Sequence, residues 1–466
     1  MRLQTFAFKA GLLVTTMLLL SLTSFSQERN DSLQPSTTTW SLQQCISYAL
    51  ENNLSIKSQA EGLTVQKNTL NASRYGLLPS IDVNGTQSVS NGRALDQTTY
   101  QFSNQTVKYT NASLSGSMIL FAGFQKQNSI KKNNLDLMAG LQDFEKLKND
   151  ISLNIAAAYL QILFNQELTK VADDQLALTK QQVDQTRKLV DAGKVVIGNL
   201  LDVQAQEASE ELQLVDAQNN LYMSKLTLTQ YLDLRDSLIE VSAPNLDSVL
   251  IVSVNVQSQD IYPIAEKNMP EIKSAEFRVE SAQKSIDIAM GGYYPQLSLN
   301  VSYGSSYSDV REQVKLVNGV PTTEKYPFFN QMKDNANLGV YLNLSIPIFS
   351  GFSNHYNTSS AKANFQRAKI NLDIEKNTLF KNIQQAYADA VASFRRYVST
   401  KKSVATMQES YNYTQNRFNL GLINSIDYNT AKSKLTRAQS DLLQAKYEYI
   451  FKTKILDFYR GMPIKL

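Results

Sequence analysis

The sequence contains two very long stretches with the hydrophobic period of an α-helix, from about 126 to 192 and from about 354 to 420. Each stretch ends at a glycine, Gly193 or Gly421, in the position where a left-handed residue closes a helix. At 1.5 Å per residue, the first helix would extend on the order of 100 Å. No small globular core encloses such a helix, so the sequence predicts a rod or tube rather than two or three globular domains.

A shorter helix follows each glycine and returns along the long one, which predicts helical hairpins over about 126–232 and 354–459. The expected seam positions step by three and four residues, as in a coiled coil. They are Ala205, Ala208, Leu212, Val215, Asn219, Tyr222 and Leu226 in the first copy, and Ala431, Leu435, Ala438, Leu442, Ala445 and Tyr449 in the second. An earlier helical run, about 42–76, is expected to stack end to end with the first returning helix beside the long one.

Alternating apolar and polar residues predict four strands, at about 81–90, 107–120, 296–304 and 337–347, with one pair before each long helix. One apolar and one polar face are typical of a membrane barrel. Four strands cannot close a barrel, and an open sheet edge in lipid leaves backbone groups unpaired. Several copies of the chain must therefore contribute. Three copies would supply twelve strands, and four copies would also close.

The first 26 residues have the pattern of a secretory signal peptide, with two basic residues, an apolar stretch and a cleavage position after Ser26. The alternative, a membrane anchor, needs about 20 apolar residues, and this stretch is shorter. Cys45 lies too far away to carry a lipid and is expected to be a packed thiol. The expected divisions are a removed leader at 1–26, a first structural repeat at 27–240, an equatorial connection at 241–261 and a second repeat at 262–466.

The composition argues against catalysis. The 466 residues include one Cys and one His, which excludes an intrachain disulfide and a site with several histidine ligands. His355 is expected at the surface or an interface rather than in a catalytic triad. The chain has no glycine-rich nucleotide-binding motif, and its net charge of +4 is too small for a nucleic-acid surface. We therefore expect no enzyme activity, no cofactor, no metal and no nucleic-acid partner.

Four kinds of short motif occur in a fixed order along the chain. They are Ser41-Leu42 leading into Ala49-Leu50-Glu51-Asn52-Asn53, helix–proline–strand junctions at Pro79 and Pro295, Phe-x-Gly-Phe strand exits at 121–124 and 349–352, and the turns that begin at Gly193 and Gly421. Over about 40–461, this order resembles the TolC-type outer-membrane efflux proteins, which are exit ducts of tripartite pumps and type I secretion systems. The resemblance implies a mainly α-helical homotrimer. Its duplicated coiled-coil hairpins would form a periplasmic α-barrel, and its strands a shared twelve-stranded outer-membrane β-barrel.

The resemblance also implies functional positions at the hairpin tips, where the entrance closes in the family. Acidic residues at the starts of the returning helices ring that entrance. Asp427 matches this position, and Asp202 is expected to be its counterpart. From its residue type alone, Asp427 is also explained as a helix N-terminal residue favoured by the helix dipole. Some members have a second Asp three residues later, where this chain has Thr430.

Other tip positions differ from the family pattern. The Tyr and Arg of the tip lock in some members fall on Phe418 and Ile423, so that lock is not carried over. The resemblance assigns Gly193, Gly421 and Ile423 to the shape of the tips and to docking of a periplasmic adaptor. Since Gly193 to Asp202 is three residues longer than Gly421 to Asp427, the first tip is expected to be the longer one.

The implied function is a passive outer-membrane exit duct. It would receive substrates from a periplasmic adaptor and an inner-membrane transporter of the RND, ABC or MFS type, and its strands would contact outer-membrane lipid. The alternative is a trimeric coiled-coil structural or adhesive surface protein. Such proteins usually place one barrel contribution at the C-terminus, whereas here the strand pairs lie inside a tandem repeat.

Overall fold

The computed structural model describes residues 39–95, 100, 102–104, 106–235, 239–243, 258–317 and 319–464. The chain divides into two units, Met1–Thr39 and Trp40–Leu466, and the fold described below is that of the second unit. The expected leader at 1–26 lies outside the described residues, as do residues 244–257 of the expected equatorial connection.

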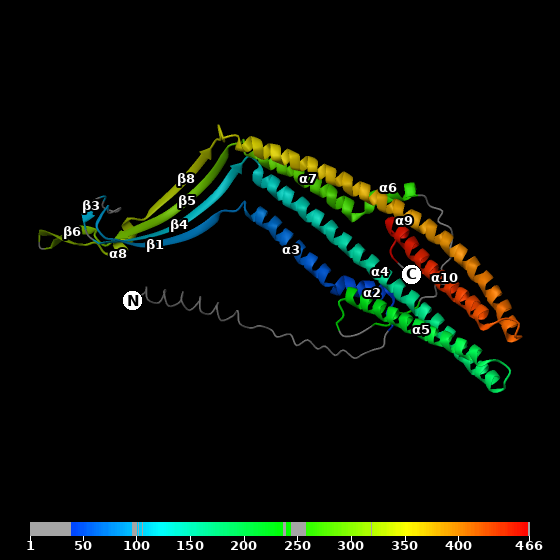
Figure 1. Ribbon diagram of the computed structural model, residues 1–466. Coiled ribbons are helices and arrows are strands. Elements are labelled where there is room, and N and C mark those ends of the chain that lie inside the picture. The colour runs from blue at the N-terminus through cyan, green and yellow to red at the C-terminus, as the bar shows by residue number, and fades with distance from the viewer. Residues whose placement is uncertain are drawn as a thin grey trace. The chain divides into compact units, whose positions relative to one another are not determined.

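Four helices recur in the two halves of the chain with equal lengths (Figure 1). They are α2 (Leu42–Asn52) and α6 (Ser258–Asn268) of 11 residues, α3 (Leu54–Tyr75) and α7 (Pro270–Gly291) of 22, α4 (Gln125–Asp191) and α9 (Ser353–Asn419) of 67, and α5 (Ile197–Tyr231) and α10 (Ser425–Tyr459) of 35. In each half the long helix pairs with its returning helix, α4 with α5 and α9 with α10. The predicted duplicated hairpins are confirmed. None of the described helices is long and apolar enough to cross a membrane.

The helical run expected over about 42–76 is two helices rather than one. The break falls at Asn53, whose side-chain oxygen accepts hydrogen bonds from the backbone N–H groups of Ser55 and Ile56 and so caps α3. The amide nitrogen of the same side chain donates to the carbonyl of Tyr231 at the end of α5, over 3.1 Å. The start of α3 is therefore fastened to the end of α5, and both helices pack on α4.

The four main strands form one antiparallel sheet. They are β1 (Ser80–Ser90), β4 (Val107–Ala122), β5 (Gln296–Ser308) and β8 (Asn337–Ser345), in the order β1-β4-β5-β8. The two halves of the chain join in the middle of the sheet, where β4 pairs with β5. Within the described residues, β1 and β8 each have a neighbour on one side only, so the sheet has two open edges.

The described parts of the loops beyond the sheet contain two short hairpins and a short helix. The first holds a short hairpin, β2 (Arg93–Leu95) with β3 (Phe102–Asn104). The second holds the hairpin β6 (Glu312–Val317) with β7 (Val320–Lys325), followed by α8 (Phe328–Asp334). Gln331 on α8 is fully buried. Its amide accepts from the backbone nitrogen of Ser308 and donates to the carbonyls of Ser308 and Tyr326, which fixes α8 against β5.

The larger hydrophobic core lies where α2, α4, α5 and α10 meet. At its centre, the hydroxyl of Tyr159 lies 2.5 Å from the carbonyl oxygen of Ser242 and 3.1 Å from that of Trp40, so it fastens both flanking segments to α4. Cys45 is fully buried in this core, which confirms the packed thiol, and burial raises its pKa to about 12. A second core joins α6, α7, α9 and the end of α10 around Ile272.

The packing seam of the second hairpin follows the predicted positions, but that of the first does not. On α10 the predicted positions Leu435, Ala438 and Ala445 are buried. On α5 the buried residues are instead Leu200, Val203, Glu210, Ala217, Ser224, Leu228 and Thr229. The predicted positions Ala205, Ala208, Leu212, Val215, Asn219 and Tyr222, here called the outer stripe of α5, are all exposed. The prediction was wrong because α5 carries two stripes of suitable period, and period alone does not tell which one faces α4.

Each strand-to-helix junction turns through two consecutive left-handed residues. Gly123 and Phe124 have φ of +56° and +61°, and Gly351 and Phe352 have +59° and +62°. A side chain at Gly123 would place its Cβ 2.3 Å from the carbonyl oxygen of Gly291, whereas Gly351 has open space around it. The backbone conformation is the same at the two junctions, but only the first is also closely packed.

This difference gives a matched pair of substitutions. Gly351→Ala should cost about 1–2 kcal/mol, because only the left-handed backbone is strained. Gly123→Ala should lower the thermal unfolding midpoint of the detergent-purified protein further, because the added methyl group also collides with Gly291. Equal midpoints for the two variants would contradict the packing argument.

Candidate functional site

The two hairpin tips close with the same local structure. Gly193 and Gly421 have φ of +70° and +73°, as expected for glycines that end α4 and α9. The N–H of Lys194 donates to the carbonyl of Leu189, and that of Leu422 donates to Arg417, so each turn is closed by the same long backbone hydrogen bond. The two glycines shape the tips in the way that the sequence predicts.

The tips are equal in length, which corrects the expected pairing of Asp202 with Asp427. The residue before the returning helix is Val196 in the first hairpin and Asn424 in the second, three positions after the glycine in both. Asp427 is the third residue of α10, and its counterpart on α5 is Asn199. Asp202 is the sixth residue of α5, so its counterpart is Thr430. The difference in glycine-to-aspartate spacing reflects where the acid lies on the helix and not a longer turn.

The carboxylate of Asp427 is exposed and is not the helix cap. The cap is Asn424, whose side-chain oxygen accepts from the backbone nitrogen of Asp427 over 2.8 Å. In the first turn of α10 the Asp427 charge lies near the positive end of the helix dipole, which stabilises it there. Its side chain remains open to solvent.

Asp202 instead joins the two hairpins. The hydroxyl of Ser425, at the start of α10, donates to the Asp202 carboxylate over 2.7 Å. Ser425 is almost fully buried, so this hydrogen bond is partly shielded from water. The tip of the second hairpin is thereby tied to α5 of the first.

A buried ion pair makes a second link between the hairpins, further from the tips. Nζ of Lys432, on α10, lies 2.9 Å from a carboxylate oxygen of Glu210, on α5. The hydroxyl of Thr179, on α4, contacts both charged groups. Both charged side chains are at least 95% buried. Burial lowers the pKa of Lys432, an effect that the neighbouring Glu210 opposes.

Sequence reasoning missed this cluster. Glu210 lies on the buried stripe of α5, seven residues from both Val203 and Ala217, where a coiled coil expects an apolar side chain. A charge at such a position signals a buried partner. The apolar period instead predicts the seam at the outer stripe, so Glu210 is not expected to be buried.

One of the two positions that correspond to the family's tip lock, Phe418, belongs to an aromatic cluster within the second hairpin. The ring of Phe418 stacks on that of Tyr428 with centroids 4.7 Å apart, and the hydroxyls of Tyr428 and Tyr411 lie 2.8 Å apart. These contacts join α9 to α10 and not one hairpin to the other. Ile423 lies in the turn and is half-buried.

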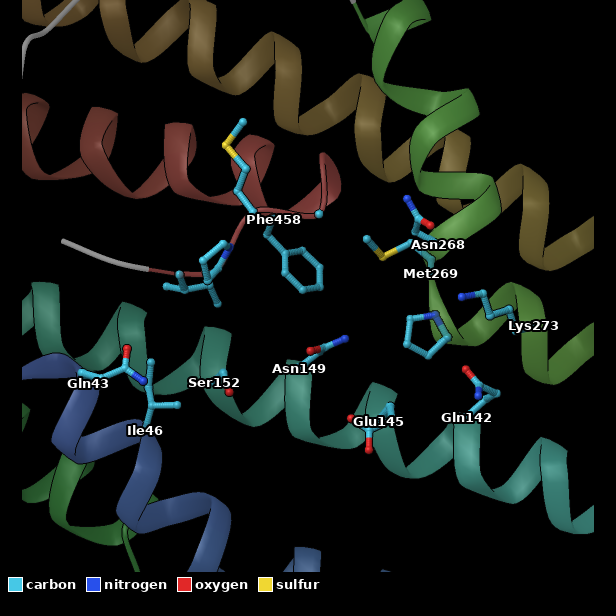
Figure 2. Close-up of a pocket in the computed structure, with 15 residues that line it drawn as sticks. Gln43, Ile46, Gln142, Glu145, Asn149, Ser152, Asn268, Met269, Lys273 and Phe458 are labelled. Atoms are coloured by element: carbon cyan, nitrogen blue, oxygen red, sulfur yellow. The ribbon is translucent and has the colours of Figure 1, made fainter.

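A cavity of about 550 Å³ lies away from the tips, between α2, α4, the α6–α7 junction and the end of α10 (Figure 2). Gln43, Glu145, Asn149 and Lys273 line it beside Phe458. These groups form no nucleophile–base arrangement. The described residues contain no group of three His, Cys, Asp or Glu side chains that could hold a metal ion.

His355 lies exposed near the start of α9, with its ring beside that of Tyr356. This places it at the surface, as the sequence predicts.

The sequence profile of the outer membrane efflux protein family matches residues 45–233 and 261–454, which include both hairpins almost completely. The chain belongs to this family. The predicted resemblance is confirmed, and the family is one of outer-membrane transport proteins rather than enzymes.

Individual relatives agree with this assignment. Outer membrane protein TolC of Escherichia coli (strain K12) is 24% identical over 416 residues, which cover 88% of this chain and 80% of TolC. Toxin and drug export protein A of Aggregatibacter actinomycetemcomitans is 22% identical over 358 residues, 74% of this chain and 71% of that protein. The CmeC outer membrane channel of Campylobacter jejuni has a similar fold, with a TM-score of 0.75 and 17% identity over 90% of this chain and 85% of CmeC. The predicted fold class is confirmed.

The buried ion pair yields a prediction about stability. Lys432→Met should destabilise the protein by about 3–5 kcal/mol, because it leaves Glu210 charged, buried and unpaired. The double variant Lys432→Met with Glu210→Met should recover most of the loss, since it removes both charges together. Thermal unfolding followed by far-UV circular dichroism measures both. A double variant no more stable than Lys432→Met alone would show that the pair does not act as a unit.

Proposed function

We propose that this chain is the outer-membrane exit duct of an efflux pump or type I secretion system, which conducts substrates passively to the cell exterior. The observation that carries the proposal is the family match across both hairpins, joined to a sheet with two open edges. The family is named for efflux, and one of the relatives is named for toxin and drug export. The proposal includes removal of residues 1–26 as a signal peptide, with the repeats 27–240 and 262–466 as the two halves of the mature protomer.

The open edges support a homotrimer. Backbone groups on β1 and β8 need partners in lipid, and another copy of the same sheet supplies them. Three copies give twelve strands, a number within the range of closed outer-membrane barrels. Apolar side chains on the outer strands, such as Val83 and Leu342, are exposed in the single chain and would face the lipid.

The hairpin tips support docking of a periplasmic adaptor. Large apolar side chains are exposed at both of them: Val196, Ile197 and Leu201 in the first, and Leu420, Leu422 and Ile426 in the second. Gly193, Gly421 and Ile423 hold the turns that present these side chains. An inner-membrane transporter of the RND, ABC or MFS type would supply the energy through the adaptor. The chain itself would need neither a cofactor nor enzyme activity.

Asp427 is our candidate for a ring of negative charge at the entrance. Its carboxylate is exposed next to the tip, and three copies would bring three such charges together. Asp202 has a different role in this proposal. The hydrogen bond between Asp202 and Ser425 holds one hairpin against the other, and so does the ion pair between Lys432 and Glu210. The entrance would open when these two contacts break.

A deletion strain tests the function. Loss of the gene should increase accumulation of fluorescent dyes or abolish secretion of a polypeptide, and the wild-type gene on a plasmid should reverse the defect. The adhesive alternative predicts unchanged accumulation and export with reduced surface attachment, and that outcome would reject the exit duct.

Conductance in planar bilayers tests the entrance ring. Asp427→Ala should lower cation selectivity, seen as a reversal potential closer to zero across a salt gradient, because negative charge at a constriction concentrates cations. Asn199→Asp, which places an acid at the equivalent position of the first tip, should raise the cation selectivity. An unchanged reversal potential in Asp427→Ala would overturn the assignment.

A further inference from the structure

The four-stranded sheet has one apolar face. Residues that pair directly across antiparallel strands lie on the same face, and successive residues along a strand alternate between the two faces. Two neighbouring rows of paired residues on this face are Ile81, Gly116, Val301 and Val340, and Val83, Leu114, Tyr303 and Leu338. Their large side chains are exposed in the single chain, so in the proposed barrel this face would meet the lipid.

The opposite face is polar, and most of its side chains are small. The three rows of paired residues that alternate with the apolar rows are Ser80, Ser117, Asn300 and Tyr341, then Asp82, Ser115, Ser302 and Gly339, then Asn84, Ser113, Gly304 and Asn337. Polar side chains fill the interior of an outer-membrane barrel that holds water. In the proposed assembly this face would therefore line the lumen.

Asp82 is the only charged side chain on the polar face. The strands β1, β4, β5 and β8 carry one other charge, Lys108, which pairs with Val89 and so lies on the apolar face near the far end of the sheet. The Asp82 side chain is exposed and forms no ion pair within the described part of the chain. The hydroxyl of Ser115, its cross-strand neighbour, donates to the backbone carbonyl of Asp82 over 3.5 Å and leaves the carboxylate open.

The strand itself does not require a charge at this position. Asp is depleted in β-strands, and the next residue on the same face of β1 is Asn84, which has nearly the same shape without the charge. A residue that the local structure disfavours, at a position where an uncharged one fits, is typical of a functional position.

Asp82 lies at the end of the sheet that adjoins the helices (Figure 1). It is the third residue of β1, about 7 Å along the strand from its start, and α3 ends at Tyr75 just before it. In the proposed duct this is where the helical portion opens into the barrel. The entrance at the hairpin tips lies at the other end of the 67-residue helices, on the order of 100 Å away.

The width of the lumen decides when such a charge can act. Twelve strands about 4.8 Å apart and tilted by about 40° enclose a barrel of about 25 Å between opposite backbones. A charge on the wall is then about 12 Å from the axis, which exceeds the Debye length of about 8 Å at physiological salt and is well below the 30 Å at 0.01 M. The field of Asp82 would therefore reach the axis in dilute salt only.

We propose that Asp82 from each copy forms a second ring of negative charge, at the inner end of the barrel lumen, which favours cationic over anionic solutes. The inference rests on the proposed homotrimeric duct and adds a residue that determines its selectivity. Because the lumen is wide at this ring, its effect depends on salt. It acts separately from Asp427, since the two positions lie at opposite ends of the helical portion.

Reversal potentials in planar bilayers test the ring, with the purified full chain and a tenfold KCl gradient. In the Asp427→Ala background, Asp82→Asn should lower the permeability ratio of K⁺ to Cl⁻ by about twofold when the dilute side is about 0.01 M. The ratio should not change when both sides exceed about 0.3 M, where screening removes the field from the axis. Asn84→Asp, which adds an acid at the next position on the same face, should raise the ratio in dilute salt.

Thiol modification gives a matched control on the two faces. Asp82→Cys treated with a sulfonate-bearing methanethiosulfonate should regain the cation preference, and the trimethylammonium reagent should reverse it. Val83→Cys, the next residue on the apolar face, should respond to neither reagent in the bilayer. The native Cys45 can stay, because it is fully buried.

The outcomes separate this ring from the duct itself. Conducting channels whose permeability ratio in dilute salt is unchanged by Asp82→Asn would overturn the ring and leave the exit duct intact. Equal responses of Asp82→Cys and Val83→Cys to the two reagents would also overturn it, because the faces would then be wrongly assigned. A wild-type protein that forms no conducting channel would reject the proposed duct as well.

Discussion

The fold depends on covering the apolar faces of two helices of 67 residues. Each of these helices extends well beyond the hydrophobic core that it crosses. Near the tips α4 pairs with α5 and α9 with α10, and nearer the sheet α3 and α7 contact α4 while α7 also contacts α9. Asn53 makes this possible in the first half, because it ends one short helix, caps the next and holds the end of α5. The long helices are thus stabilised along their length by shorter ones laid end to end, and the hydrophobic cores form where those short helices meet.

Much of this architecture could be predicted from the sequence, because it follows from periodicity and from turn chemistry. The glycines at 193 and 421, the alternation in the strands and the seam of α10 each report a local backbone requirement. The predicted seam of α5 was wrong because an apolar period leaves the rotation of the helix about its axis undetermined. The pairing of Asp202 with Asp427 was wrong for another reason: it matched residue type, whereas an equal count from each glycine pairs Asp427 with Asn199.

The contacts between hairpins were out of reach for a different reason. Lys432, Glu210 and Thr179 come from three helices and lie as many as 253 residues apart, so no window of sequence brings them together. The position of Glu210 on the buried stripe of α5 signals a partner, but nothing in the sequence names Lys432 or Thr179 as that partner. Only the folded chain shows that Lys432 and Glu210 neutralise each other in a buried place, where removing either one alone is costly.

The equality of the two tips has a consequence for any protein that meets them. In a threefold assembly the backbone repeats six times around the entrance, whereas the chemical groups repeat three times, because Asn199 alternates with Asp427 and Thr430 with Asp202. A partner that recognises shape alone would find six equivalent binding sites. A partner that recognises charge would find three equivalent binding sites. The stoichiometry of the complex would therefore report which property the partner recognises.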